Sequence, residues 1–172
     1  EEGKIVLLDV EESLEASDNS DDDEEERDLL GEMELKARIM ITGGDSKEEA
    51  LMTRADRLTI RTAIIEAAKD KQAVNPDEIV LTQDVVAALK KLSQDETSTP
   101  KRRERAQDMA DAMALYCSGT AGHFFNRVGK AWPEADVTIL EMGILANEGY
   151  EDQLALGFMG LMNQINGVVE RE

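Results

Sequence analysis

The chain has 172 residues, of which 41% are hydrophobic and only 3% aromatic, and its formal net charge is -19. This length favours one domain, and a core poor in aromatic side chains favours helix-on-helix packing over a β-sandwich. The negative charge argues against a general nucleic-acid surface, because a phosphate backbone would be repelled over most of the protein. The single cysteine, Cys117, excludes an internal disulfide and fits a reducing compartment.

The N-terminal region, residues 1–27, differs in composition from the rest. Residues 4–10 are an apolar run that we interpret as a candidate strand, with a helix start or a disordered end as the alternatives. The acidic tract that follows is unbroken from Asp21 to Glu26 and lacks the ligand spacing of a calcium loop. We therefore expect a solvated, disordered linker before a mainly helical region that occupies residues 28–172.

No segment is long and apolar enough to span a bilayer, and the acidic start lacks the residue order of a signal peptide. We expect a cytoplasmic protein without membrane insertion. Because the chain begins with Glu rather than Met, we interpret it as a fragment of a longer protein.

Capping signals and apolar periodicity predict helices in the first half of the helical region. A first helix is expected over residues 25–42, ended by Gly43-Gly44. Capping boxes at Ser46 and Thr53 predict a short helical turn, a bend, and then a main helix over residues 54–69. The residues expected on the buried face of that main helix are Leu58, Ile64, Ile65 and Ala68.

The second half follows a loop at residues 70–81. A helix capped by Thr82 is expected over residues 82–93, with Val85, Val86 and Leu89 facing inward. Thr99 as a cap and Pro100 at the first helical position predict a helix to about Cys117. A last helix is expected over residues 151–169.

Residues 137–142 are the expected strand, because Val137 to Leu140 favour β-structure. A loop with most of the aromatic residues is expected before it; these are His123, Phe124, Phe125 and Trp132. A strand, turn and helix form half of a βαβ unit, which needs a parallel partner strand, and residues 4–10 are the local candidate. The predicted fold class is mainly α, with four or five helices and this small β element.

Two groups of basic residues could bind a phosphate or pair with carboxylates. Arg54, Arg57 and Arg61 recur along one helix edge, and we expect them to pair with nearby carboxylates. Residues 101–105 are the concentrated basic cluster; we expect a solvated helix of mixed charge, with a nucleic-acid or nucleotide contact as the alternative.

No catalytic, cofactor-binding or metal site is assigned. Residues 128–131, Val-Gly-Lys-Ala, imitate a phosphate-binding loop, but Phe124 replaces the first Gly and Ala131 the magnesium-binding Ser or Thr. His123 is the single histidine, and it follows Cys117 without an evident third group to orient it. We therefore interpret Cys117 as a small buried residue rather than a nucleophile.

Two long stretches carry a resemblance to a known family. The first reads Leu-Gly-Glu-Met-Glu-Leu-Lys-Ala-Arg-Ile-Met-Ile-Thr-Gly-Gly at residues 30–44, followed by Lys-Glu-Glu-Ala and Leu-Met-Thr-Arg-Ala-Asp-Arg. The second, within residues 111–171, includes Gly-His-Phe-Phe-Asn-Arg, Trp-Pro-Glu-Ala-Asp-Val-Thr-Ile-Leu-Glu-Met-Gly and Leu-Met-Asn-Gln-Ile-Asn. Together they resemble the TraC-like conjugative transfer ATPases of bacterial type IV secretion systems, especially those of integrating conjugative elements.

The resemblance implies that these residues are the helical insertion and an edge region of a RecA-like P-loop ATPase. In that family the P-loop lies upstream of such a region and the acidic strand end downstream, so no catalytic residue is carried over. The parent would use ATP and magnesium, form an oligomer at the cytoplasmic face of the inner membrane, and contact other secretion-system proteins. This piece alone would be inactive and would not contact nucleic acid directly. The alternative is a free-standing acidic helical adaptor that binds a protein partner.

Overall fold

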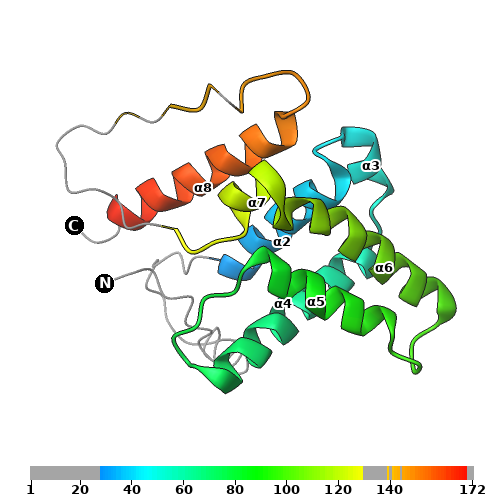
Figure 1. Ribbon diagram of the computed structural model, residues 1–172. Helices are drawn as coiled ribbons and strands as arrows, with labels where there is room; N and C mark the ends of the chain where they lie inside the picture. The colour runs from blue at the N-terminus through cyan, green and yellow to red at the C-terminus, as the bar shows by residue number, and fades with distance from the viewer. Residues whose placement is uncertain (1–27, 130–138, 140, 144, 170–172) are drawn as a thin grey trace, which may run out of the picture.

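The computed structural model describes residues 28–129, 139, 141–143 and 145–169. Over these ranges the chain forms seven α-helices and one 3-10 helix and no strand, so the expected mainly α class is confirmed (Figure 1). The elements in chain order are α2 (Leu29–Thr42), α3 (Ser46–Leu51), α4 (Arg54–Val74), α5 (Thr82–Ser93), α6 (Pro100–Ala114), η1 (Leu115–Cys117), α7 (Gly119–Phe125) and α8 (Glu151–Val169).

Helix α2 is bounded by local capping contacts. It begins at Leu29 rather than near residue 25, because the Asp28 carboxylate accepts a hydrogen bond from the Gly31 N–H at 2.7 Å. Gly43 ends it with φ of 61°, a left-handed conformation that costs a residue with a Cβ about 1–2 kcal/mol. The predicted glycine stop is confirmed.

The N-caps of α3 and α4 form side-chain hydrogen bonds of the predicted kind, but the residue that caps α3 is not the predicted one. Asp45, not Ser46, caps α3, because its carboxylate accepts from the Lys47 and Glu48 N–H groups at 2.8 and 3.0 Å. The capping box at Thr53 is confirmed: the Asp56 N–H donates to Thr53 Oγ1 at 3.2 Å, and the Thr53 N–H donates to Asp56 Oδ2 at 2.9 Å.

The predicted length and face of α4 need correction. The helix continues to Val74 instead of ending at residue 69. It ends at Val74 because Asn75, which precedes Pro76, has an extended backbone conformation. Leu58 was expected to be buried but is 55% exposed, whereas Ile60 is fully buried. Two residues turn a helix by about 200°, so these two side chains lie on opposite faces.

Helices α5 and α6 have nearly the predicted bounds. Leu81 rather than Thr82 is the N-cap of α5, and its N–H donates to Asp84 Oδ2 at 2.8 Å. Thr99 caps α6 with Pro100 at the first position, as predicted. The last turn before Ser118 tightens into η1, so the α-helix ends at Ala114.

Helix α7 was expected to be a loop. Residues 119–125 instead form two turns of helix, and Gly122 packs directly over the preceding chain. A Cβ at Gly122 would lie 2.6 Å from the carbonyl carbon of Cys117, so this position needs glycine for close packing.

Most of the core lies where α4, α5 and α6 meet. Helix α5 contacts both α4 and α6 (Figure 1), and α2 also contacts α4 and α6. Ile60, Leu89 and Met109 from the three helices are at most 1% exposed. Helix α8 lies along α2 and adds the buried Leu156 to the same core. Of the helices in the described ranges, none combines the length and apolar character that crossing a bilayer requires.

The strand predicted at residues 137–142 is not found where the structure describes that segment. Ile139, Glu141 and Met142 belong to no strand, and Ile139 is 90% exposed; residues 137, 138 and 140 lie outside the described ranges. A lone extended segment needs a partner strand, and the described part of the chain offers none. The candidate strand at 4–10 and the acidic tract also lie outside the described residues, whereas α8 has the predicted bounds 151–169.

Candidate interaction groove

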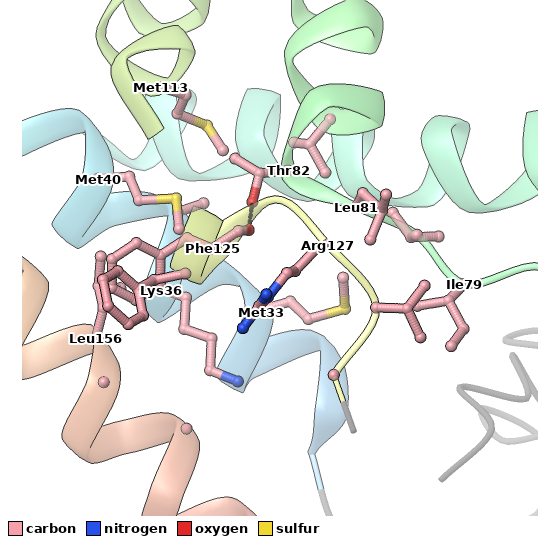
Figure 2. A pocket seen from close by; sticks show the side chains of 18 of the residues that line it. Met33, Lys36, Met40, Ile79, Leu81, Thr82, Met113, Phe125, Arg127 and Leu156 are labelled. Carbon is pink, nitrogen blue, oxygen red and sulfur yellow. Dashed lines mark hydrogen bonds between the residues drawn. The ribbon is translucent and has the colours of Figure 1, made fainter. Parts of the chain in front are cut away.

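An apolar groove of about 470 Å³ opens between α2, the segment before α5, the end of α7 and α8 (Figure 2). Such a volume is typical of pockets that take small ligands or a few side chains of a partner. Its lining residues are mainly aliphatic and aromatic. They include Met33, Ala37 and Met40 of α2; Ile79, Val80 and Leu81; Met113; Phe124 and Phe125; and Leu145, Leu156 and Leu161.

The wall formed by α7 is held against the start of α5 by side-chain hydrogen bonds. Thr82 Oγ1 donates to the Phe125 carbonyl at 2.5 Å (Figure 2). The Gln83 N–H donates to Asn126 Oδ1 at 2.9 Å, and Asn126 Nδ2 donates in turn to Gln83 Oε1 at 3.1 Å and to the Cys117 carbonyl at 3.3 Å. Asn126 therefore satisfies an open N–H group at the start of α5 and fixes where α7 ends.

The wall formed by α8 is attached at both ends of α2. Near the start of α8, Asp152 accepts a hydrogen bond from the buried Tyr116 hydroxyl and packs against Gly44. Eleven residues further along, Asn163 Nδ2 donates to Glu32 Oε2 at 2.7 Å, so α8 runs antiparallel to α2. Burial and the Asp152 carboxylate both raise the pKa of the Tyr116 phenol far above its ordinary value, so it stays a donor.

Two glycines shape the surface of α8 that faces the groove. A Cβ at Gly157 would lie 3.2 Å from Met142 Cε, in tight contact, whereas a Cβ at Gly160 would meet no atom within 4 Å. The groove wall therefore has little room for a side chain at Gly157, whereas a side chain at Gly160 would meet open space.

The charged residues that line the groove are cationic. Lys36 projects from α2 and Arg127 from the segment after α7 (Figure 2), and no described lining residue is a carboxylate. In a chain with a net charge of -19, this apolar surface with two cations beside it suits an apolar ligand that carries a neighbouring negative charge.

A separate ionic cluster joins α2 to α4. Glu34 is 2% exposed, and its carboxylate accepts from Arg57 Nε at 2.6 Å and from Arg61 Nε, with Arg38 NH1 at 3.6 Å. Burial would raise the pKa of Glu34, but the two arginine hydrogen bonds outweigh it and hold the pKa below its ordinary value. The expectation that these arginines pair with carboxylates is confirmed for Arg57 and Arg61; Arg54 is exposed.

The basic cluster at 101–105 contributes one comparable pair. Arg105 Nε contacts Asp56 Oδ1 at 3.2 Å, which links α6 to α4. Burial would raise the pKa of Asp56, but hydrogen bonds from Thr53 and the charge of Arg105 lower it. Lys101 and Arg102 are exposed.

The remaining sequence candidates are not brought together into a catalytic arrangement in the described residues. His123 is exposed, with Nε2 3.2 Å from Arg127 NH1. Cys117 is half-buried, and burial raises the pKa of its thiol, which disfavours a thiolate nucleophile. Gly129 borders the groove, while residues 130 and 131 lie outside the described ranges. No group of His, Cys, Asp and Glu in the described part could hold a metal ion.

The groove itself was not predicted from the sequence. Its walls come from segments between Met33 and Leu161, and the apolar run Ile79–Leu81, placed in a predicted loop, was the local signal that could have pointed to it. Comparison with protein-family models, with curated proteins and with solved structures gives no match to this chain.

Proposed function

We propose that this chain is the mainly helical, non-catalytic region of a bacterial conjugative transfer ATPase, and that its groove docks a segment of another part of the motor or of a secretion-system protein. The parent would power type IV secretion from the cytoplasmic face of the inner membrane. The family resemblance of residues 28–171 supports the ATPase assignment. The observation that carries the docking role is the apolar groove with its cationic side chains.

The residues present do not fit the ATP phosphates that the parent would bind. A phosphate-binding loop offers free backbone N–H groups around a first glycine, and here that position is Phe124, within α7. The neighbouring Asn126 N–H is already bonded to the Gly122 carbonyl at 3.0 Å. ATP and magnesium would therefore bind to other parts of the parent, and no step of hydrolysis is assigned to this chain.

A free-standing acidic adaptor is the second candidate. It is favoured by the core of α4, α5 and α6, which buries Ile60, Leu89 and Met109 without help from another chain. Both candidate functions use the groove, but they predict different coding sequences upstream and downstream of this chain.

The first experiment is therefore to read the flanking coding sequence. A G-x-x-x-x-G-K-[ST] motif upstream and an apolar strand ending in acidic residues downstream would support the ATPase region, and their absence would favour the adaptor.

The second experiment fills the groove in the whole parent protein. Gly160→Phe adds a large side chain where a Cβ meets no atom within 4 Å, so the fold should tolerate it. Ala155→Phe, at an exposed position of the same helix, is the matched control. We expect Gly160→Phe to lower ATP hydrolysis at least tenfold with unchanged helicity, and the control to leave it unchanged. Equal rates in both variants would refute the docking role.

A further inference from the structure

The groove leaves apolar side chains in contact with solvent. Phe124 and Val128, which border it, are 41% and 54% exposed. An apolar groove of this kind gains free energy from any occupant that removes its surface from water, by about 25 cal/mol per Å². The same chain contains a segment of matching chemistry, Lys-Ile-Val-Leu-Leu-Asp-Val at residues 4–10, outside the described residues.

The length of the intervening chain allows this segment to reach the groove. Residues 11–27 connect it to Asp28, where the chain enters α2. The α2 side of the groove, from Met33 to Met40, lies only about 8–18 Å along the helix axis from that entry point. A stretch of 17 residues can span at most about 56–61 Å when fully extended. The connecting residues are thus long enough for the segment to reach the groove, so that its binding there would be intramolecular.

Charge favours the same occupant. The tract next to the apolar segment contains the acidic run from Asp21 to Glu26, and among the described residues the charged side chains lining the groove are Lys36 and Arg127. An apolar segment followed by carboxylates matches an apolar groove beside two cations. No other apolar run in this chain outside the described helices is followed by such an acidic tract.

We propose that the apolar segment 5–8 occupies the groove in cis, with the acidic tract beside Lys36 and Arg127, and that an external partner must displace it. The segment acts as a tethered competitor. If it fills the groove nine-tenths of the time, it weakens the apparent affinity of an external peptide about tenfold. This inference concerns the chain alone, so it stands whether the parent is an ATPase or an adaptor.

The test uses the full chain with ¹³C-labelled methionine methyl groups. Leu7→Asp/Leu8→Asp removes the apolar character of the segment, and Ser13→Asp/Ser17→Asp adds the same charge within the acidic tract as a matched control. We expect the methyl signals of the groove to shift in the first variant and to stay in place in the second. The groove methionines are Met33, Met40 and Met113, and Met109, which is 1% exposed in the core, is the internal reference.

A spin label identifies the occupant. It is placed at Val10→Cys, just outside the segment 5–8, in a Cys117→Ser background, and we expect it to broaden the groove methyl signals even after tenfold dilution with unlabelled protein. Loss of the broadening on dilution would mean that a second copy supplies the segment, and would overturn the proposal. The proposal would also be overturned if Trp132→Ala shifted the methyl signals of the groove while Leu7→Asp/Leu8→Asp left them in place. It would likewise be overturned if neither variant shifted them. Circular dichroism at 222 nm checks that each variant keeps its helicity.

A competition experiment measures the predicted displacement. A fluorescent peptide of residues 1–12 should bind the Leu7→Asp/Leu8→Asp chain about tenfold more tightly than the unmodified chain. Raising the salt concentration should narrow this difference, because screening weakens the contact of the acidic tract with the two cations. Equal affinities for the two proteins at low salt would refute a competitor in cis.

Discussion

Replacing Glu34 by Gln removes one charge from the buried contact between α2 and α4 while keeping the shape of the side chain. In the native protein the carboxylate accepts a hydrogen bond from each of Arg57 and Arg61. The amide retains one acceptor oxygen, but its NH₂ group would face the second guanidinium, which has no acceptor to offer it.

The expected cost follows from burial on the two sides of the contact. Breaking a fully buried ion pair costs about 3–5 kcal/mol, mainly because the remaining charge stays buried. Here Glu34 is 2% exposed, but Arg57 and Arg61 are 47% and 43% exposed and can be hydrated. We therefore expect a loss of about 2 kcal/mol at pH 7, the range of a hydrogen bond to a charged group.

The assay is urea unfolding followed by circular dichroism between pH 7 and pH 2.5. Because the pKa of Glu34 is lowered from 4.5 in the folded protein, its stabilisation is present above pH 4.5 and is lost as pH falls through the folded-state pKa. The difference between the native protein and Glu34→Gln should shrink over that range. Glu104→Gln, at an exposed helical position, is the control and should change stability by less than about 0.5 kcal/mol. A cost below about 0.5 kcal/mol for Glu34→Gln, or one independent of pH, would refute the argument.

Three further predictions test the packing, a helix stop and the missing nucleotide site. Leu89→Ala should lower the free energy of unfolding by about 2–5 kcal/mol, because Leu89 is fully buried. Leu58→Ala should lower it by less than about 0.5 kcal/mol, because Leu58 is 55% exposed. Similar costs for the two variants in urea unfolding would contradict the observation that Leu58 lies on the exposed face of α4. Gly43→Ala should cost about 1–2 kcal/mol through its φ of 61° alone, since a Cβ there meets no atom within 4 Å; a neutral change in thermal unfolding would show that the helix stop has another origin. Calorimetry with ATP and magnesium should find no site tighter than about 1 mM, or roughly 4 kcal/mol, and a micromolar magnesium-dependent site would show that the phosphate-binding chemistry of residues 128–131 has been misjudged.

The sequence predicted helix ends best where the contact is local. The capping box of Thr53 and Asp56 spans three residues, and Thr99-Pro100 fixes the start of α6 within one turn. Gly43 likewise ends α2 through its own backbone conformation. Such contacts are encoded by neighbouring residues, so a pattern of residue types is enough to find them.

Elements that depend on distant partners were missed. Helix α7 is held by contacts of Phe125 and Asn126 with Thr82 and Gln83, 43 residues away in the chain. Nothing in the sequence near Phe125 signals those partners. The groove combines four such segments, so neither its position nor its cationic side chains follow from local patterns.

The attachment of α8 has a consequence for the order in which the protein folds and opens. Helices α4, α5 and α6 follow one another in the chain and pack as neighbours, so their contacts close short loops and form early. The contact of Asn163 with Glu32 spans 131 residues, and among the described side chains of α8 Leu156 is the one in the buried core. We therefore expect helix α8 to dock late in folding and to be among the first helices to detach in native-state fluctuations. Since α8 forms one wall of the groove, the groove can open on the timescale of this local unfolding while the three-helix core stays folded.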